Sequence, residues 1–333
     1  MAITREYLAA FQRLFDVIPP RGKLLSFGRP TMMWENAPTP EEFLKSLGFD
    51  EVHSLDIDER EGATHIHDLN KKDIPSELIG RYDVVLAGGT LEHVFDVANG
   101  LRSASRMLAD GGYLAIGGPA NNWVDHGFYQ ICPTLLLDYF TENGFDLLRS
   151  RGRFDRPGAP SLDLAVHPGE AQLINNFPGR VIFSVVVRRR KESTVDRIPT
   201  QELYARKRDG QGHRYRIGVE EPYAITPGGL APLPMTRFEL RPQGIAPGLG
   251  AYAIRFHNPA HPASLEGRPF RSQGLVYEDG NLLDWVVSRP EMVAERPGSF
   301  CHFRGFVHLT ASDGSDPRGN GRSYQIAFPE PYW

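Results

Sequence analysis

From residue 22 onward, short apolar runs alternate with segments of helical periodicity. This order is typical of a parallel sheet covered by helices, because each strand returns through a helical crossover. Strands are expected at residues 23–27, 51–56, 64–67, 82–87, 113–116, 145–149 and 181–188, with helices at 41–47, 97–108 and 133–143. The last two strands flank an insertion that contains Pro and Gly, so an antiparallel final pair is expected.

The length of 333 residues and a change of pattern near residue 191 predict more than one domain. Residues 1–21 carry apolar side chains at helical spacing and read as an N-terminal helix. Residues 22–190 form the α/β domain. Pro and Gly are dense after that, and residues 200–333 read as a β-rich C-terminal domain of unknown role, in which Asp279-Gly280 is expected to turn a hairpin.

Charge and composition restrict the partners. The chain has 37 basic and 41 acidic residues and a net charge of -4, which supplies no field for a phosphate backbone, so no nucleic acid is expected. Two cysteines are too few for a disulfide framework and fit a cytoplasmic protein. No stretch reaches the roughly 18–20 apolar residues that span a bilayer, so no membrane partner is expected. A small-molecule substrate is expected, and homo-oligomers stay open.

Three residues follow the first three strands, where open parallel sheets bind ligands. Gly28 allows a close backbone approach, Asp56 can accept hydrogen bonds from ribose hydroxyls, and Asp68 from an adenine amino group. The alternatives are a simple turn at Gly28, a helix cap at Asp56 and an exposed turn at Asp68.

A longer segment, YDVVLAGGTLEHVFDVANGLRSASRMLADGGYLAIGGP, is more specific than these single residues. It joins a strand beginning Tyr82-Asp83 to Leu91-Glu92-His93-Val94 and to a helix that Asp110-Gly111-Gly112 is expected to end. Over about residues 22–190 the chain resembles the class I S-adenosylmethionine-dependent methyltransferases. The resemblance implies a Rossmann-like seven-stranded sheet with helices on both faces, an antiparallel last strand, and S-adenosylmethionine as cofactor.

The resemblance also implies where the cofactor binds. Gly28 would lie beside the methionine part, Asp56 on the ribose and Asp68 near the adenine. The complete implied set is Phe27, Gly28, Asp56, Ile57, Asp68, Leu69, Gly88, Gly89 and Leu91. The first loop departs from the family pattern, because it keeps a single glycine where several are usual.

The segment after the fifth strand is expected to form the substrate wall. Its polar members are Asn121, Asn122, Asp125, Tyr129 and Gln130. His126 is the first candidate for a general base and His93 the second, since imidazole titrates near neutral pH; structural histidines are the alternative. His65 and His67 lack further ligands at a recognisable spacing, so no metal site is expected.

These residues favour methyl transfer to a hydroxyl of a polar small molecule, such as a sugar or a glycosylated metabolite. The alternative is a catalytically inactive methyltransferase-like binding module, with the β-rich domain as its interaction surface. A nicotinamide-dependent oxidoreductase is disfavoured, because no Gly-x-Gly-x-x-Gly follows the first strand.

Overall fold

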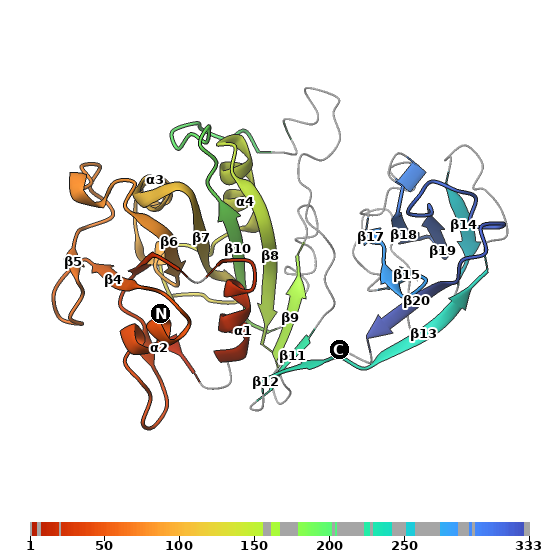
Figure 1. The fold of residues 1–333 in the computed structure, drawn as a ribbon, viewed down its shortest axis with the longest axis horizontal. Coiled ribbons are helices and arrows are strands. Elements are labelled where there is room, and N and C mark those ends of the chain that lie inside the picture. The colour runs from red at the N-terminus through yellow and green to blue at the C-terminus, as the bar shows by residue number, and fades with distance from the viewer. Residues whose placement is uncertain are drawn as a thin grey trace. The chain divides into compact units, whose positions relative to one another are not determined.

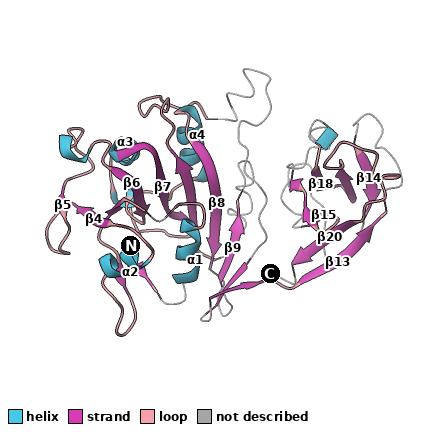
Figure 2. Ribbon diagram, in the orientation of Figure 1, coloured by secondary structure: helices cyan, strands magenta, loops and turns pink. Residues whose placement is uncertain are grey.

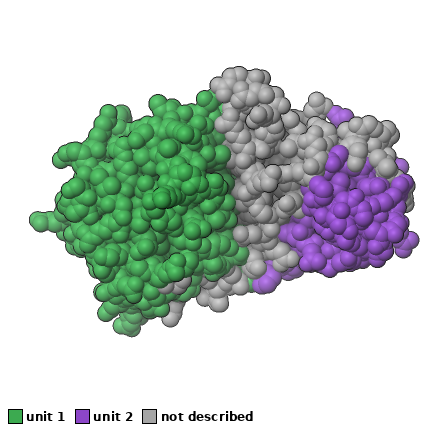
Figure 3. All heavy atoms as spheres, turned by 45° about the horizontal axis from the view of Figure 1, so that its top comes forward, with its two compact units in different colours: residues 1–168, 177–217, 223–231 green, residues 169–176, 218–222, 232–333 purple. Residues whose placement is uncertain are grey.

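The computed structural model describes residues 2–4, 8–19, 21–155, 161–166, 179–201, 204, 223–226, 229–241, 251–256, 274–285, 293–294 and 297–329. The chain divides into two compact units (Figure 3). The first comprises residues 1–168, 177–217 and 223–231, and the second comprises 169–176, 218–222 and 232–333.

A ten-stranded sheet forms the centre of the first unit, in the order β12-β11-β9-β8-β10-β7-β6-β2-β4-β5 (Figure 1). Strands β5, β4, β2, β6 and β7 are parallel, and β10 is antiparallel to both β7 and β8. Seven neighbouring strands of this sheet, from β8 to β5 in the spatial order given above, confirm the expected seven-stranded Rossmann-like sheet. They are β2 (Lys23–Phe27), β4 (Glu51–Asp56), β5 (His65–Ile66), β6 (Tyr82–Gly88), β7 (Leu108–Asn121), β8 (Asp146–Phe154) and β10 (Val181–Arg188).

Three further strands extend this sheet beyond β8. They are β9 (Ser161–Ala165), β11 (Tyr223–Thr226) and β12 (Gly229–Pro232). At the other end of the sequence, β1 (Ala2–Ile3) pairs in parallel with β3 (Thr31–Met32). The seven-stranded expectation did not include these additions.

Helices cover both faces of the sheet. The helix α1 (Leu8–Gln12), the 3₁₀ turn η1 (Arg13–Phe15) and α2 (Pro40–Ser46) share one apolar core with the strands. That core contains Phe11, Phe15, Phe43, Leu24, Val84 and Ala115. The helix α3 (Val97–Met107) contacts β6 and β7, and α4 (Pro133–Glu142) contacts β8 and β10. A 3₁₀ turn, η2 (Ser76–Leu78), precedes β6, and another, η3 (Leu91–His93), follows it.

Asp110-Gly111-Gly112 lies inside β7 and does not end the preceding helix. The helix α3 ends at Met107, and Leu108 already pairs with Tyr82 of β6. Gly111 has φ +79° and donates its N–H to the Arg189 carbonyl at 3.1 Å. The expected helix end is therefore wrong, because these glycines permit an irregularity within a strand.

The second unit is a β domain built from two four-stranded sheets (Figure 2). One sheet contains β13 (Met235–Leu240), β20 (Tyr324–Pro329), β15 (Leu275–Glu278) and β16 (Asn281–Leu282). The other contains β14 (Tyr252–Arg255), β19 (Phe306–Leu309), β18 (Ser299–Phe303) and β17 (Asp284–Trp285). Side chains of both sheets share one core that includes Ile254, Val276, Phe300 and Ile326. This confirms the expected mostly β C-terminal part.

Two hairpins of this domain turn on left-handed residue pairs. Asp279 and Gly280 have φ +48° and +83° between β15 and β16, which confirms the expected turn. Arg304 and Gly305 have φ +51° and +82° between β18 and β19. Positive φ at both central residues is the type I′ geometry that matches the twist of paired strands.

No helix in the described ranges is long and apolar enough to cross a bilayer.

The domain boundary stays a prediction, and limited proteolysis of the full chain tests it. The sequence predicts cleavage between about residues 191 and 212, of which 202–203 and 205–212 lie outside the described residues. Asn143 anchors the first part of this segment, because it bonds with Thr194 and Arg197 at 3.0–3.1 Å. Trypsin is therefore expected to cut on the C-terminal side of this anchored part, at Arg206, Lys207 or Arg208. Cleavage confined to residues 22–190 would contradict the boundary.

Candidate functional site

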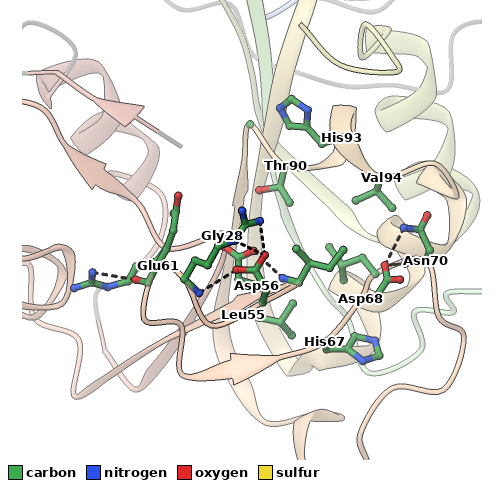
Figure 4. A pocket seen from close by; sticks show the side chains of 16 residues that line it. Gly28, Leu55, Asp56, Glu61, His67, Asp68, Asn70, Thr90, His93 and Val94 are labelled. Carbon is green, nitrogen blue, oxygen red and sulfur yellow. Dashed lines mark hydrogen bonds and ion pairs between the residues drawn. The ribbon is translucent and has the colours of Figure 1, made fainter.

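The carboxyl ends of β2, β4 and β6 surround a pocket of about 580 Å3 (Figure 4). Six residues of the expected cofactor set line it: Gly28, Asp56, Ile57, Asp68, Leu69 and Gly89. These residues lie close together because each stands at or just after the carboxyl end of a parallel strand, and such ends share one edge of the sheet.

Gly28 forms a tight turn at the end of β2. Its φ is +70°, and its N–H donates to the Leu55 carbonyl at 2.8 Å. The Thr90 hydroxyl donates to the Phe27 carbonyl at 2.7 Å, which joins this turn to the loop after β6. A side chain at Gly28 would be strained in the left-handed conformation. Phe27 itself has a fully buried side chain, and its carbonyl accepts the hydrogen bond from Thr90.

Two carboxylates are fixed beside this turn. Asp56 Oδ1 accepts from the Ile57 N–H at 2.7 Å. Asp68 Oδ1 accepts from the backbone N–H and the side-chain amide of Asn70, at 2.9 and 2.8 Å (Figure 4). These hydrogen bonds from Asn70 lower the pKa of Asp68, so its carboxylate is ionised at neutral pH. The pocket therefore presents oriented acceptors for polar groups of a ligand.

A second pocket of about 480 Å3 adjoins the first, and Gly89 and His93 line both. Its walls are largely apolar and come from α1, η1 and the sheet. They include Phe11, Leu14, Leu86, Ile116 and Ile182. The polar lining groups are Glu92, His126, Arg153 and Ser184, together with Thr4.

Glu92 is buried beside the two candidate histidines. Its side chain is 1% exposed, and Oε1 lies 3.8 Å from His126 Nε2 and 4.0 Å from His93 Nε2. Burial raises the pKa of Glu92 to about 6. Burial and the neighbouring His126 lower the pKa of His93. Both imidazoles are about half exposed, at 50% for His93 and 42% for His126.

The loop after β7 brings His126 to His93. Asn122 and Asp125 adopt left-handed φ values of +59° and +63°, and the Phe128 N–H donates to the Glu92 carbonyl at 2.7 Å. The centroid of the His126 ring lies 5.0 Å from that of the Trp123 ring and 5.2 Å from that of the His93 ring. The structure thus brings the two candidate bases together in the lining of the second pocket.

The substrate wall stays a prediction, and the structure gives the present contacts of its residues. Asn122 donates to the Gly179 carbonyl, Tyr129 to the Phe95 carbonyl, and Gln130 accepts from the Trp123 N–H. Asn121 pairs with Val181 in the sheet, and Asp125 is exposed. None of these five belongs to the described lining of either pocket. The hydrogen bonds of Asn122, Tyr129 and Gln130 hold the loop that carries Trp123 and His126.

The last two residues of the expected cofactor set, Gly88 and Leu91, lie in different surroundings. Gly88 lines the second pocket. Leu91 is buried and packs against α3, where a Cβ on Gly100 would lie 2.7 Å from Leu91 Cδ2. Close helix packing explains Leu91 without a ligand.

Sequence reasoning missed several lining residues. Glu92 directly precedes the candidate base His93 in Leu91-Glu92-His93-Val94, so the sequence could have indicated it as a site residue. Arg153 and Ser184 carried no such signal, because only the antiparallel pairing of β8 and β10 brings them to this pocket.

Comparison with family models identifies a methyltransferase domain. Residues 2–166 match the family model described as "Methyltransferase domain". No curated protein matches the chain.

Three solved structures represent the similar folds. An S-adenosylmethionine dependent methyltransferase from Mesorhizobium loti is 14% identical, with 54% of this chain and 98% of that chain covered and a TM-score of 0.36. The N-methyltransferase NodS from Bradyrhizobium japonicum WM9 is 14% identical, with 56% and 96% covered and a TM-score of 0.38. The 1,6-didemethyltoxoflavin-N1-methyltransferase from Burkholderia thailandensis is 14% identical, with 56% and 79% covered and a TM-score of 0.37.

Proposed function

Because residues 2–166 belong to the class I S-adenosylmethionine-dependent methyltransferase family, we propose that this chain transfers a methyl group from S-adenosylmethionine to a hydroxyl of a polar small molecule. One observation carries the proposal. Two pockets meet at Gly89 and His93, so a donor in one lies beside an acceptor in the other. Such an arrangement suits a two-substrate transfer, in which holding the reactants together supplies much of the rate.

The residues of the first pocket fit the cofactor. Its volume lies within the roughly 300–1,000 Å3 usual for small-molecule sites. The turn at Gly28 would contact the methionine part, Asp56 would accept from the ribose hydroxyls, and Asp68 would accept from the adenine amino group. When bound, S-adenosylmethionine supplies an electrophilic methyl group on a sulfonium.

The residues of the second pocket indicate the acceptor class. Phe11, Leu14 and Leu86 would contact an apolar body, whereas Arg153 and Ser184 would bind polar groups. A glycosylated metabolite combines both parts, and fits this lining better than a bare sugar does. His126 would orient the acceptor hydroxyl or remove its proton, since it lines this pocket next to the shared His93.

Calorimetric titration of the full chain with S-adenosylmethionine tests the cofactor assignment. We expect one molecule bound per chain, with a Kd within the range of about 1 µM to 1 mM usual for KM values of enzyme substrates. S-adenosylhomocysteine is expected to compete for the same site. Transfer of labelled methyl groups to a panel of glycosides then tests the acceptor class.

Absence of cofactor binding would favour the alternative of an inactive methyltransferase-like binding module. Binding without transfer to any glycoside, but with transfer to an amine, would retain the cofactor site and replace the acceptor.

A further inference from the structure

We propose that Glu92, His93 and His126 form a binding site for a divalent transition-metal cation of the zinc or manganese type. One carboxylate oxygen and two imidazole nitrogens, one from each residue, all lie within 4.8 Å of one another. The three side chains come from the 3₁₀ turn η3 after β6 and from the loop after β7.

The strongest single observation is the state of Glu92. Its side chain is 1% exposed, and both carboxylate oxygens lack a hydrogen bond within the part of the chain that the structure describes. A buried ionised carboxylate that accepts no hydrogen bond is costly, because the hydration that it loses is not replaced. A cation between Glu92 and the two imidazoles would supply the missing partner.

The distances between the ligand atoms allow one ion to contact all three. Zinc lies about 2.0–2.2 Å from nitrogen and oxygen ligands, so two donors on one tetrahedral ion are about 3.3–3.6 Å apart. Glu92 Oε1 is 3.8 Å from His126 Nε2 and 4.0 Å from His93 Nε2. Rotation of the two half-exposed imidazoles can close the remaining gap.

Glycines leave room around this carboxylate. A Cβ on Gly118 would lie 2.9 Å from Glu92 Oε2, and a Cβ on Gly89 would lie 3.5 Å from Oε1. A Cβ on Gly127 would lie 2.7 Å from the Glu92 carbonyl oxygen. Glycine in the interior of a strand, as at Gly118 in β7, marks a close approach by another group.

The donor set selects the class of cation. Two imidazoles and one carboxylate suit borderline transition metals and leave further coordination positions open, whereas Mg²⁺ and Ca²⁺ prefer oxygen ligands alone. Both Glu92 and His126 line the second pocket, so open positions would face the acceptor. A hydroxyl bound there would lose its proton more easily. This use rests on the proposed function, but cation binding does not.

The test uses the full chain, freed of metal with EDTA and desalted. Titration with Co²⁺, followed by visible absorption, and with Zn²⁺, followed by calorimetry, is expected to show one ion per chain. Because even an outer-sphere change costs about 10–100-fold in affinity, loss of a ligand in Glu92→Gln or His126→Gln is expected to cost about 100-fold or more. The control Glu77→Gln removes an exposed carboxylate outside both pockets and is expected to bind as the wild type does.

Circular dichroism checks that each variant is folded. His126→Gln decides the question if Glu92→Gln does not fold, since His126 is half exposed on a loop. Wild-type protein that binds no ion, or a folded His126→Gln variant with unchanged affinity, would refute the site. Titration of the same samples with S-adenosylmethionine separates the two proposals. Cation binding without cofactor binding would refute the proposed function alone, and cofactor binding without cation binding would refute this site alone.

Discussion

His126→Ala is expected to lower turnover by about 10²–10⁴-fold and to leave the affinity for S-adenosylmethionine nearly unchanged. The reason is the position of His126 in the second pocket, outside the described lining of the first. A group that acts on the acceptor hydroxyl affects the transfer step and not cofactor binding. Steady-state kinetics with calorimetry on the same protein measures both quantities.

His93→Ala is the matched comparison, because His93 Nε2 also lies near Glu92 Oε1, at 4.0 Å, and His93 lines both pockets. If turnover falls strongly in His93→Ala and is unchanged in His126→Ala, His93 is the residue that acts on the acceptor hydroxyl. If only thermal stability falls in both variants, the histidines are structural. Methyl transfer would then depend on proximity alone.

Rescue experiments distinguish two ways in which His126 could act. If His126 is a general base, added imidazole is expected to restore part of the turnover of His126→Ala, without added metal. If His126 is a cation ligand, excess Zn²⁺ or Mn²⁺ is expected to restore part of the turnover of His126→Ala, because the remaining ligands, Glu92 and His93, still bind the cation weakly.

Asp56→Ala is expected to raise the Kd for S-adenosylmethionine by about 10–100-fold, since hydrogen bonds to a charged group contribute about 1.5–3 kcal/mol. Asp56 ends β4 and is only partly buried, so its removal is expected to leave the fold intact. Calorimetry measures the Kd, and thermal unfolding checks the fold.

Asp73→Ala is the matched control, because Asp73 is an exposed aspartate outside the described lining of both pockets. An Asp56→Ala variant that binds the cofactor as tightly as Asp73→Ala does would remove Asp56 from the site.

The sequence alone determined the seven central strands of the sheet and the main polar residues of the first pocket. Apolar runs of strand length separated by helical segments predict parallel strands, and the carboxyl ends of such strands share an edge. Gly28, Asp56 and Asp68 could therefore be predicted as neighbours from their places after β2, β4 and β5. The Asp279-Gly280 hairpin was equally local, because left-handed φ values are a property of those two residues.

Only the tertiary structure decided the second pocket. Two of the polar residues expected to bind substrate hydrogen-bond to the protein itself: Gln130 to Trp123 in the same loop, and Tyr129 to Phe95 in the loop after β6. A loop that leaves the end of a strand must pair its polar groups somewhere, and sequence does not say with what. Glu92 and His126 meet because that loop folds back onto the Glu92 backbone, where Gly127 allows the contact. Such a long-range contact depends on the path of the chain in space and leaves no periodic signal in the sequence.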